Sequence, residues 1–138
     1  MQMTLIKNTD LSPKMTTAYK IARIVYAESG GISLPLVTAF TSMIKNLADS
    51  TGMSFTDIIQ NKNIFPALDS QNPRHAHLYV RADNRAFQMC VRTAYLMLSG
   101  GLADTCYGAT MFHHADELPQ WATSRGYIAD IDNVLFYA

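Results

Sequence analysis

The stretch Ala22-Arg23-Ile24-Val25-Tyr26-Ala27-Glu28-Ser29-Gly30-Gly31 decides how this chain starts to fold. Apolar side chains recur at helical spacing over residues 18–25, which predicts a helix with one buried face. The pair Gly30-Gly31 is expected to end that helix, because glycine adopts the left-handed conformation of a helix C-terminus without strain. Glu28 is therefore predicted to lie in the last turn of the helix or just beyond it.

Further caps and glycines extend this pattern through the first hundred residues. Serines or an aspartate stand at the expected N-cap positions, and proline follows two of them in the first turn. The predicted helices cover residues 13–28 after Ser12, 34–48 after Ser33, 54–60 from Ser54, and 84–98 after Asp83. Residues 61–81 are rich in turn formers and are predicted to be irregular. A loop of this length often lines a binding site.

The last third of the chain has a different character. Strand-forming residues dominate Tyr107 to His113 and Val134 to Tyr137, and a third strand is expected near residues 126–129. Helices followed by an antiparallel sheet form an α+β domain. With 138 residues and no internal repeat or linker, residues 1–138 are expected to make one domain.

Composition limits the classes of partner. Eleven basic and eleven acidic residues cancel, so the chain lacks the basic excess that attracts nucleic acid or anionic membranes. An uncharged glycan or a small molecule suits it better. No apolar run is long enough to span a membrane, and the N-terminus does not read as a signal peptide. The two cysteines, Cys90 and Cys106, form either one bridge or two buried free thiols, of which the second is the commoner arrangement.

Glu28 is the first candidate for chemistry. Its sequence neighbours are uncharged, and both partial burial and the negative end of a helix dipole disfavour a charged carboxylate. The protonated form is the one that a general acid uses. An arbitrary glutamate at a helix end is most often an exposed surface residue, and this position alone does not distinguish the two interpretations.

Other side chains offer weaker signals. Adjacent His113 and His114 are expected to point to opposite faces of a strand, so they cannot share one metal ion. Cys106 with a histidine could form a thiol hydrolase, although no local motif supports that arrangement. Aromatic residues gather in the last part of the chain, and their flat rings can stack on sugars. Trp121, in a polar loop, is the best candidate among them, whereas Phe112 and Phe136 are equally well explained as core.

Taken in order, these pieces resemble the SleB-type cell-wall hydrolases, the catalytic domain of spore-cortex-lytic enzymes. The resemblance covers about residues 17–137 and rests on motifs that are individually weak but occur in the family's order. They are the Ala27-Glu28-Ser29-Gly30 helix end, Asn46, Asp104, Gly108-Ala109 with the aromatic strand behind it, Pro119-Gln120-Trp121, and Phe136-Tyr137. The family's second helix ends on an asparagine, which Asn46 matches.

The resemblance implies a lysozyme-like helical core beside a small antiparallel sheet near the C-terminus. It implies a monomer that needs neither metal nor cofactor, binds peptidoglycan glycan strands and acts on the cell wall. Glu28 would cleave the bond between N-acetylmuramic acid and N-acetylglucosamine. The residues predicted to contact the glycan are Phe65, Tyr107, Phe112, His113, Trp121 and Tyr137.

The sequence leaves open the reaction mechanism and one alternative function. Ordinary glycoside hydrolysis needs a second carboxylate, and Asp104 and Asp116 are the nearest ones in the motifs. Neither is a clear partner for Glu28, which favours a lytic transglycosylase that uses one glutamate as both acid and base. The alternative function is a catalytically weak peptidoglycan-binding or phage virion protein on the same fold, since a fold does not fix a function.

Overall fold

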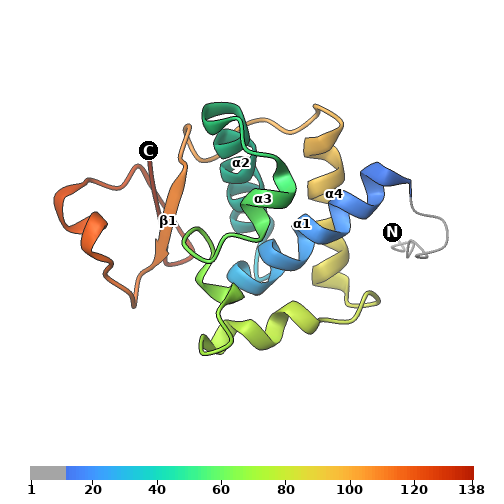
Figure 1. Cartoon of the computed structure of the whole chain (residues 1–138), viewed down its shortest axis with the longest axis horizontal. Coiled ribbons are helices and arrows are strands. Elements are labelled where there is room, and N and C mark those ends of the chain that lie inside the picture. The colour runs from blue at the N-terminus through green and yellow to red at the C-terminus, as the bar shows by residue number, and fades with distance from the viewer. Residues whose placement is uncertain (1–11) are drawn as a thin grey trace.

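The computed structural model describes residues 12–138 and shows a helical part with a small sheet beside it (Figure 1). The prediction of an α+β fold is confirmed. The helices are α1 (Pro13–Ser29), α2 (Leu34–Thr51), α3 (Phe55–Ile59) and α4 (Arg85–Leu98), with short 3-10 helices η2 (Pro66–Leu68), η3 (Pro73–Tyr79) and η4 (Gln120–Ser124). The prediction about a signal peptide concerns residues 1–8, which lie outside the described part.

Side-chain caps begin the helices where the sequence places them. The hydroxyls of Ser12, Ser33 and Ser54 each accept a backbone N–H from the first turn of α1, α2 and α3. The cap expected at Asp83 is wrong by one residue. The side chain of Asn84 accepts the N–H of Phe87 instead, and Asp83 pairs with the guanidinium of Arg81.

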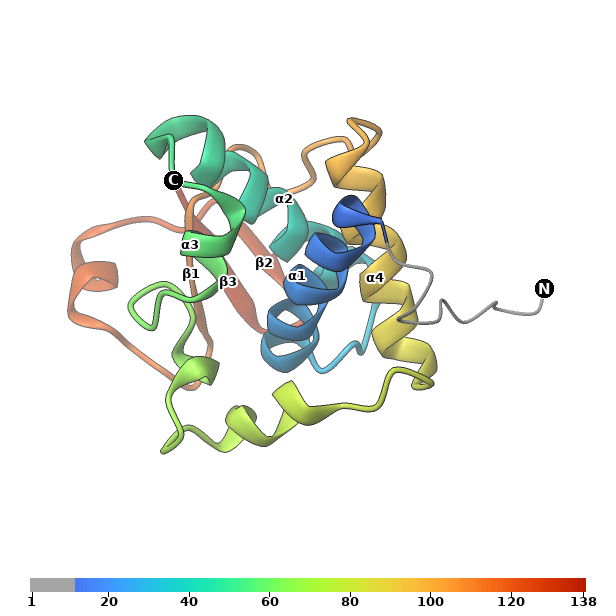
Figure 2. The same cartoon turned by 45° about the vertical axis from the view of Figure 1, so that its right-hand side comes forward.

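The segment predicted to be irregular, residues 61–81, contains η2 and η3. The view in Figure 2 shows this yellow-green segment running below α1 before the chain enters α4. Helix η3 packs on α1, and Arg23 of α1 donates two hydrogen bonds to the carbonyl oxygens of Leu78 and Val80, at 3.0 and 2.9 Å. These contacts fix the long connection against the helical core.

Three antiparallel strands form the sheet, in the order β1-β3-β2. They are β1 (Met111–His114), β2 (Ala129–Ile131) and β3 (Val134–Tyr137). The third strand was expected at residues 126–129 and lies slightly later. The first strand was expected from Tyr107, but Tyr107 and Gly108 have φ of 55° and 79° and form a turn. Strand β1 starts only after that turn, because an extended backbone requires negative φ.

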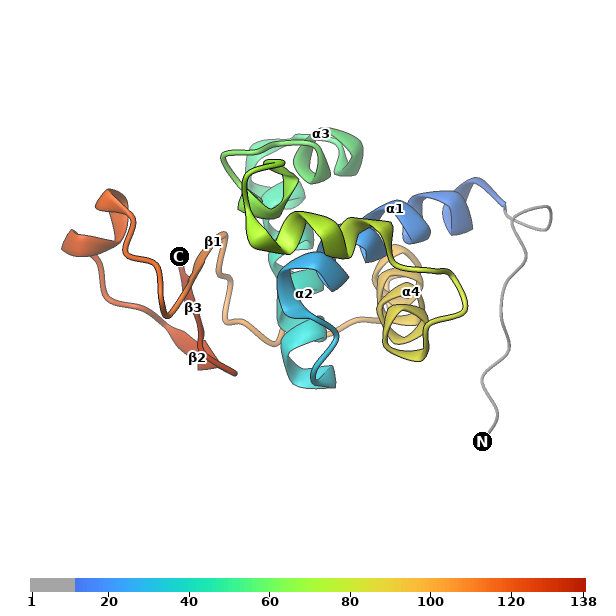
Figure 3. The same ribbon diagram turned by 90° about the horizontal axis from the view of Figure 1, so that it is seen from below.

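Phenylalanine rings join the sheet to the helices. Phe40 of α2 packs edge-on against Phe112 of β1 and Phe136 of β3, with ring centroids 4.8 and 5.3 Å apart. One hydrophobic core therefore includes both parts of the chain. Figure 3 shows the sheet on one side of α2, with α4 and α1 on the other. Within residues 12–138, none of the helices combines the length and apolar character that crossing a membrane requires.

Candidate active site

Glu28 lies in the last turn of α1, as predicted, and its side chain is fully buried. Gly30 ends the helix with φ of 65° and donates its N–H to the carbonyl of Tyr26. Gly31 follows with φ of 62°, and a Cβ there would lie 2.7 Å from the Cβ of Ala86 in α4. The two glycines thus let the chain turn sharply against α4 directly after Glu28.

The surroundings of Glu28 differ from what its sequence neighbours indicate. Arg74 of η3 donates from Nε to Oε1 at 2.9 Å, and Nε2 of His114 in β1 lies 3.2 Å from the same oxygen. The backbone N–H of Ala67 donates to Oε2 at 3.0 Å. A charged group therefore faces Glu28 in space, although none is adjacent in sequence. Three separate elements converge on one buried carboxylate.

Arg74 connects Glu28 to a second carboxylate. Its Nη2 lies 3.6 Å from Oε2 of Glu117, in the turn after β1. The other oxygen of Glu117 accepts the backbone N–H of His114 at 3.3 Å. Neither Arg74 nor Glu117 was predicted as a site residue. The only sign of Arg74 was its place in the long segment expected to line a site, and Asp116 was named where its neighbour Glu117 makes the contact.

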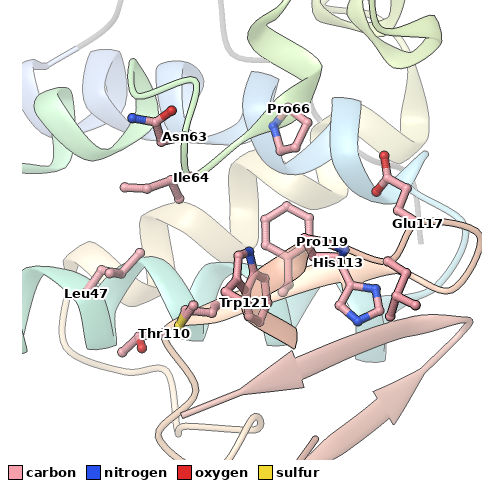
Figure 4. Close-up of a pocket in the computed structure, with 12 residues that line it drawn as sticks. Leu47, Asn63, Ile64, Pro66, Thr110, His113, Glu117, Pro119 and Trp121 are labelled. Atoms are coloured by element: carbon pink, nitrogen blue, oxygen red, sulfur yellow. The ribbon is translucent and has the colours of Figure 1, made fainter. Parts of the chain in front are cut away.

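An open pocket of about 590 Å³ lies beside this group. Its walls are largely apolar, with a few polar side chains, as small-molecule and glycan sites commonly are. Figure 4 shows Asn63 and Pro66 on one side of the pocket, with Trp121 and His113 facing them. Leu118 and Glu117, the contact of Arg74, also line the pocket.

The predicted glycan contacts divide into two groups. Phe112, His113 and Trp121 line the pocket, and Tyr137 lies behind them, stacked on His113 and edge-on to Trp121. Phe65 is fully buried against Phe112, so the role predicted for it as a sugar contact does not fit the structure. Tyr107 is 77% exposed and lies outside the pocket lining.

The adjacent histidines point to different partners, as expected for neighbours on a strand. Nδ1 of His113 lies 2.8 Å from the carbonyl oxygen of His114 and must donate to it. In a neutral ring, Nε2 of His113 then accepts from the Tyr137 hydroxyl, also at 2.8 Å. His113 therefore holds the aromatic wall of the pocket, whereas His114 turns toward Glu28.

Several residues of the resemblance motif contact one another at the turn before β1. The amide of Asn46 donates to the carbonyl of Ala109 at 3.0 Å and lies 3.5 Å from Asp104. Asp104 accepts the backbone N–H groups of Cys106 and Gly108. Burial alone would raise the pKa of Asp104, but these hydrogen bonds outweigh it and lower the pKa below its usual value. The network holds the turn before β1, so Asp104 serves Asn46 and the backbone of that turn.

Both cysteines are free and buried, which selects one of the two arrangements that the sequence left open. Burial raises the pKa of Cys90 to about 12. Burial, helped by the charge of Asp104, raises the pKa of Cys106 to about 12 as well. A thiol must lose its proton to act as a nucleophile. The arrangement therefore argues against a hydrolase built on Cys106.

We expect both thiols to react slowly with an aromatic disulfide reagent at pH 8. With a pKa near 12, the thiolate fraction is about a thousandfold below that of an ordinary cysteine. The measurement compares the rate of reagent release by the native protein and by the protein in denaturant. Equal rates, or loss of any enzymatic activity when one native thiol reacts, would contradict this assignment and restore Cys106 as a nucleophile.

No group of three or more histidine, cysteine, aspartate or glutamate side chains within residues 12–138 is arranged to hold a metal ion. Comparison with protein-family models, with curated proteins and with solved structures finds no match for this chain.

Proposed function

We propose that this protein cleaves the glycosidic bond between N-acetylmuramic acid and N-acetylglucosamine in peptidoglycan, with Glu28 as acid and base. One observation carries the proposal: each partner of Glu28 is tied to the pocket wall. Ala67 follows the pocket residue Pro66, and His114 follows His113. Arg74 pairs with Glu117, which lines the pocket itself.

The pocket also suits a glycan in its chemistry. The ring of Trp121 and the apolar residues beside it can pack on sugar faces and acetamido methyl groups. Asn63, Thr110 and His113 supply polar groups at the wall, which can select hydroxyl and acetamido positions. The zero formal net charge of the chain agrees with a polymer whose backbone is uncharged.

In the proposed reaction, Glu28 donates its proton to the bridging oxygen as the bond from that oxygen to C1 of N-acetylmuramic acid breaks. The resulting carboxylate then removes the proton of the C6 hydroxyl, and O6 forms a new bond to C1. The product is a 1,6-anhydro end, and no water is consumed. Glu28 leaves the chemical step protonated, as it entered it, so one carboxyl group is sufficient.

A second candidate function is favoured by the burial of Glu28. With its side chain fully covered and paired to Arg74, the carboxylate can also serve as a fixed structural charge in a peptidoglycan-binding protein. Purified cell-wall sacculi separate the two functions. An enzyme lowers the turbidity of the suspension, whereas a binding protein sediments with the sacculi and leaves the turbidity unchanged. Sedimentation without clearing would overturn the enzymatic proposal.

A further inference from the structure

Both carboxylate oxygens of Glu28 already have partners in the structure. Oε1 contacts Nε of Arg74 and Nε2 of His114, and Oε2 accepts the N–H of Ala67. A general acid must carry a proton on one of these oxygens and place it against the substrate. A guanidinium group has only hydrogen-bond donors and cannot accept the proton in exchange. At least one of these contacts has to open before Glu28 can act as an acid.

Arg74 has a second carboxylate, that of Glu117, within reach. Its Nη2 atom is buried, and within residues 12–138 no acceptor completes a hydrogen bond to it. Oε2 of Glu117 is the near partner at 3.6 Å, whereas a strong bond between a guanidinium and a carboxylate is about 2.7–2.9 Å long. A movement of less than about 1 Å would convert this contact into a full hydrogen bond.

The surroundings of Glu117 change when the pocket is occupied. Its side chain is 35% exposed and forms part of the pocket wall. A glycan in the pocket removes water from this carboxylate, which strengthens its attraction for a cation in contact with it. That cation is Arg74. Glu117 also accepts the backbone N–H of His114, so it contacts the side chain of Arg74 and the main chain of His114, the two residues whose side chains cover Oε1 of Glu28.

We propose that Glu117 is a positioning residue that draws Arg74 away from Glu28 when glycan fills the pocket. In the free protein Arg74 keeps Glu28 as a buried ion pair, and in the complex it pairs with Glu117. Glu28 is then released to take up a proton and reach the glycosidic oxygen. This inference rests on the proposed function, since it concerns how the same site becomes active. In this counter-ion exchange, Arg74 changes its carboxylate partner from Glu28 to Glu117.

The first test is kinetic, on soluble uncrosslinked peptidoglycan strands. Glu117→Gln removes the charge that attracts Arg74 but keeps an oxygen for the N–H of His114. We expect kcat to fall by about tenfold or more while KM changes less than about twofold, because substrate binding is retained. Glu117→Asp should recover part of the loss. In an Arg74→Lys background, Glu117→Gln should cost less than it does alone, because the two residues act as a unit.

The second test does not depend on activity. The Nε–H signal of Arg74, assigned by comparison with Arg74→Lys, is followed by NMR while tetra-N-acetylchitotetraose is added. Binding is monitored independently by the fluorescence of Trp121, the chain's single tryptophan. We expect the Arg74 signal to shift on binding to the wild type and to stay near its free position in Glu117→Gln.

The outcomes separate the inference from the proposed function. If the wild type cleaves glycan and Glu117→Gln has the same kcat, the exchange is wrong and the enzyme stands. If Glu117→Gln lowers kcat and raises KM by the same factor and is also less stable, its role is purely structural. That result would overturn the exchange as well. If the wild type neither cleaves glycan nor binds the tetrasaccharide, both fail. Binding without an Arg74 shift refutes the exchange alone.

Discussion

Glu28→Gln is expected to lower the rate of glycan release from peptidoglycan by about 10²–10⁴-fold, the usual contribution of a general acid or base. Glutamine has nearly the same shape, so the helix end and the pocket should persist, but it cannot donate a proton to the leaving oxygen. The change also removes the counter-ion of Arg74. We therefore expect the free energy of unfolding to fall by about 1–3 kcal/mol, the cost of leaving a buried group unsatisfied.

A matched control is available in the turn after β1. Asp116→Asn makes the same chemical change at an exposed carboxylate beside Glu117, and it should leave the release rate within twofold of the wild type. Near-UV circular dichroism verifies that both variants are folded. Full activity in a folded Glu28→Gln protein would remove Glu28 from the reaction. An equal loss in Asp116→Asn would show that the assay reports a general effect of charge.

Phe40→Ala is expected to have the largest effect on stability. The ring is fully buried and contacts the aromatic rings of both β1 and β3. Its removal leaves a cavity at the junction between α2 and the sheet, which should lower the free energy of unfolding by about 3–5 kcal/mol. The same junction positions His114 and Glu117 against Glu28, so activity should fall with it. Urea unfolding monitored by circular dichroism measures the change.

Leu34→Ala on the same helix is the comparison. Leu34 is 52% exposed, and surface truncations of this kind usually change the free energy of unfolding by less than about 0.5 kcal/mol. The contrast between the two variants isolates burial from helix propensity. A loss of less than about 1 kcal/mol for Phe40→Ala would mean that the sheet is held mainly by other contacts, and the single shared core would need revision.

Local chemistry explains why the helical part could be predicted closely. Serine caps, prolines in the first turn and terminal glycines act within a few residues, so they are visible in sequence. The strands were harder to place. Tyr107 has strand-forming character, but its φ of 55° belongs to a turn, and the hydrogen bonds that Asp104 accepts hold that turn. The contacts around Tyr107 override its strand propensity, and such contacts are not visible in the local sequence.

The candidate site shows the same division. Glu28, His113 and Trp121 could be named because a helix end, a strand and an aromatic loop each have a local signature. Arg74 and Glu117 could not, because their roles come only from contacts in space. Arg74 is 46 positions from Glu28 in sequence, and an arginine in an irregular segment is usually a solvated surface residue. Phe65 failed in the opposite direction, since its aromatic character serves the core.

Mass analysis of the fragments released from purified peptidoglycan tests the central claim most directly. If Glu28 alone serves as acid and base, the wild type should release disaccharide units that end in 1,6-anhydro-N-acetylmuramic acid, each one water lighter than the reducing product. Fragments that carry only reducing ends would contradict the single-carboxylate mechanism and indicate hydrolysis with a second group such as Glu117. Release of peptides alone, or of no fragments, would contradict glycosidic cleavage by this protein.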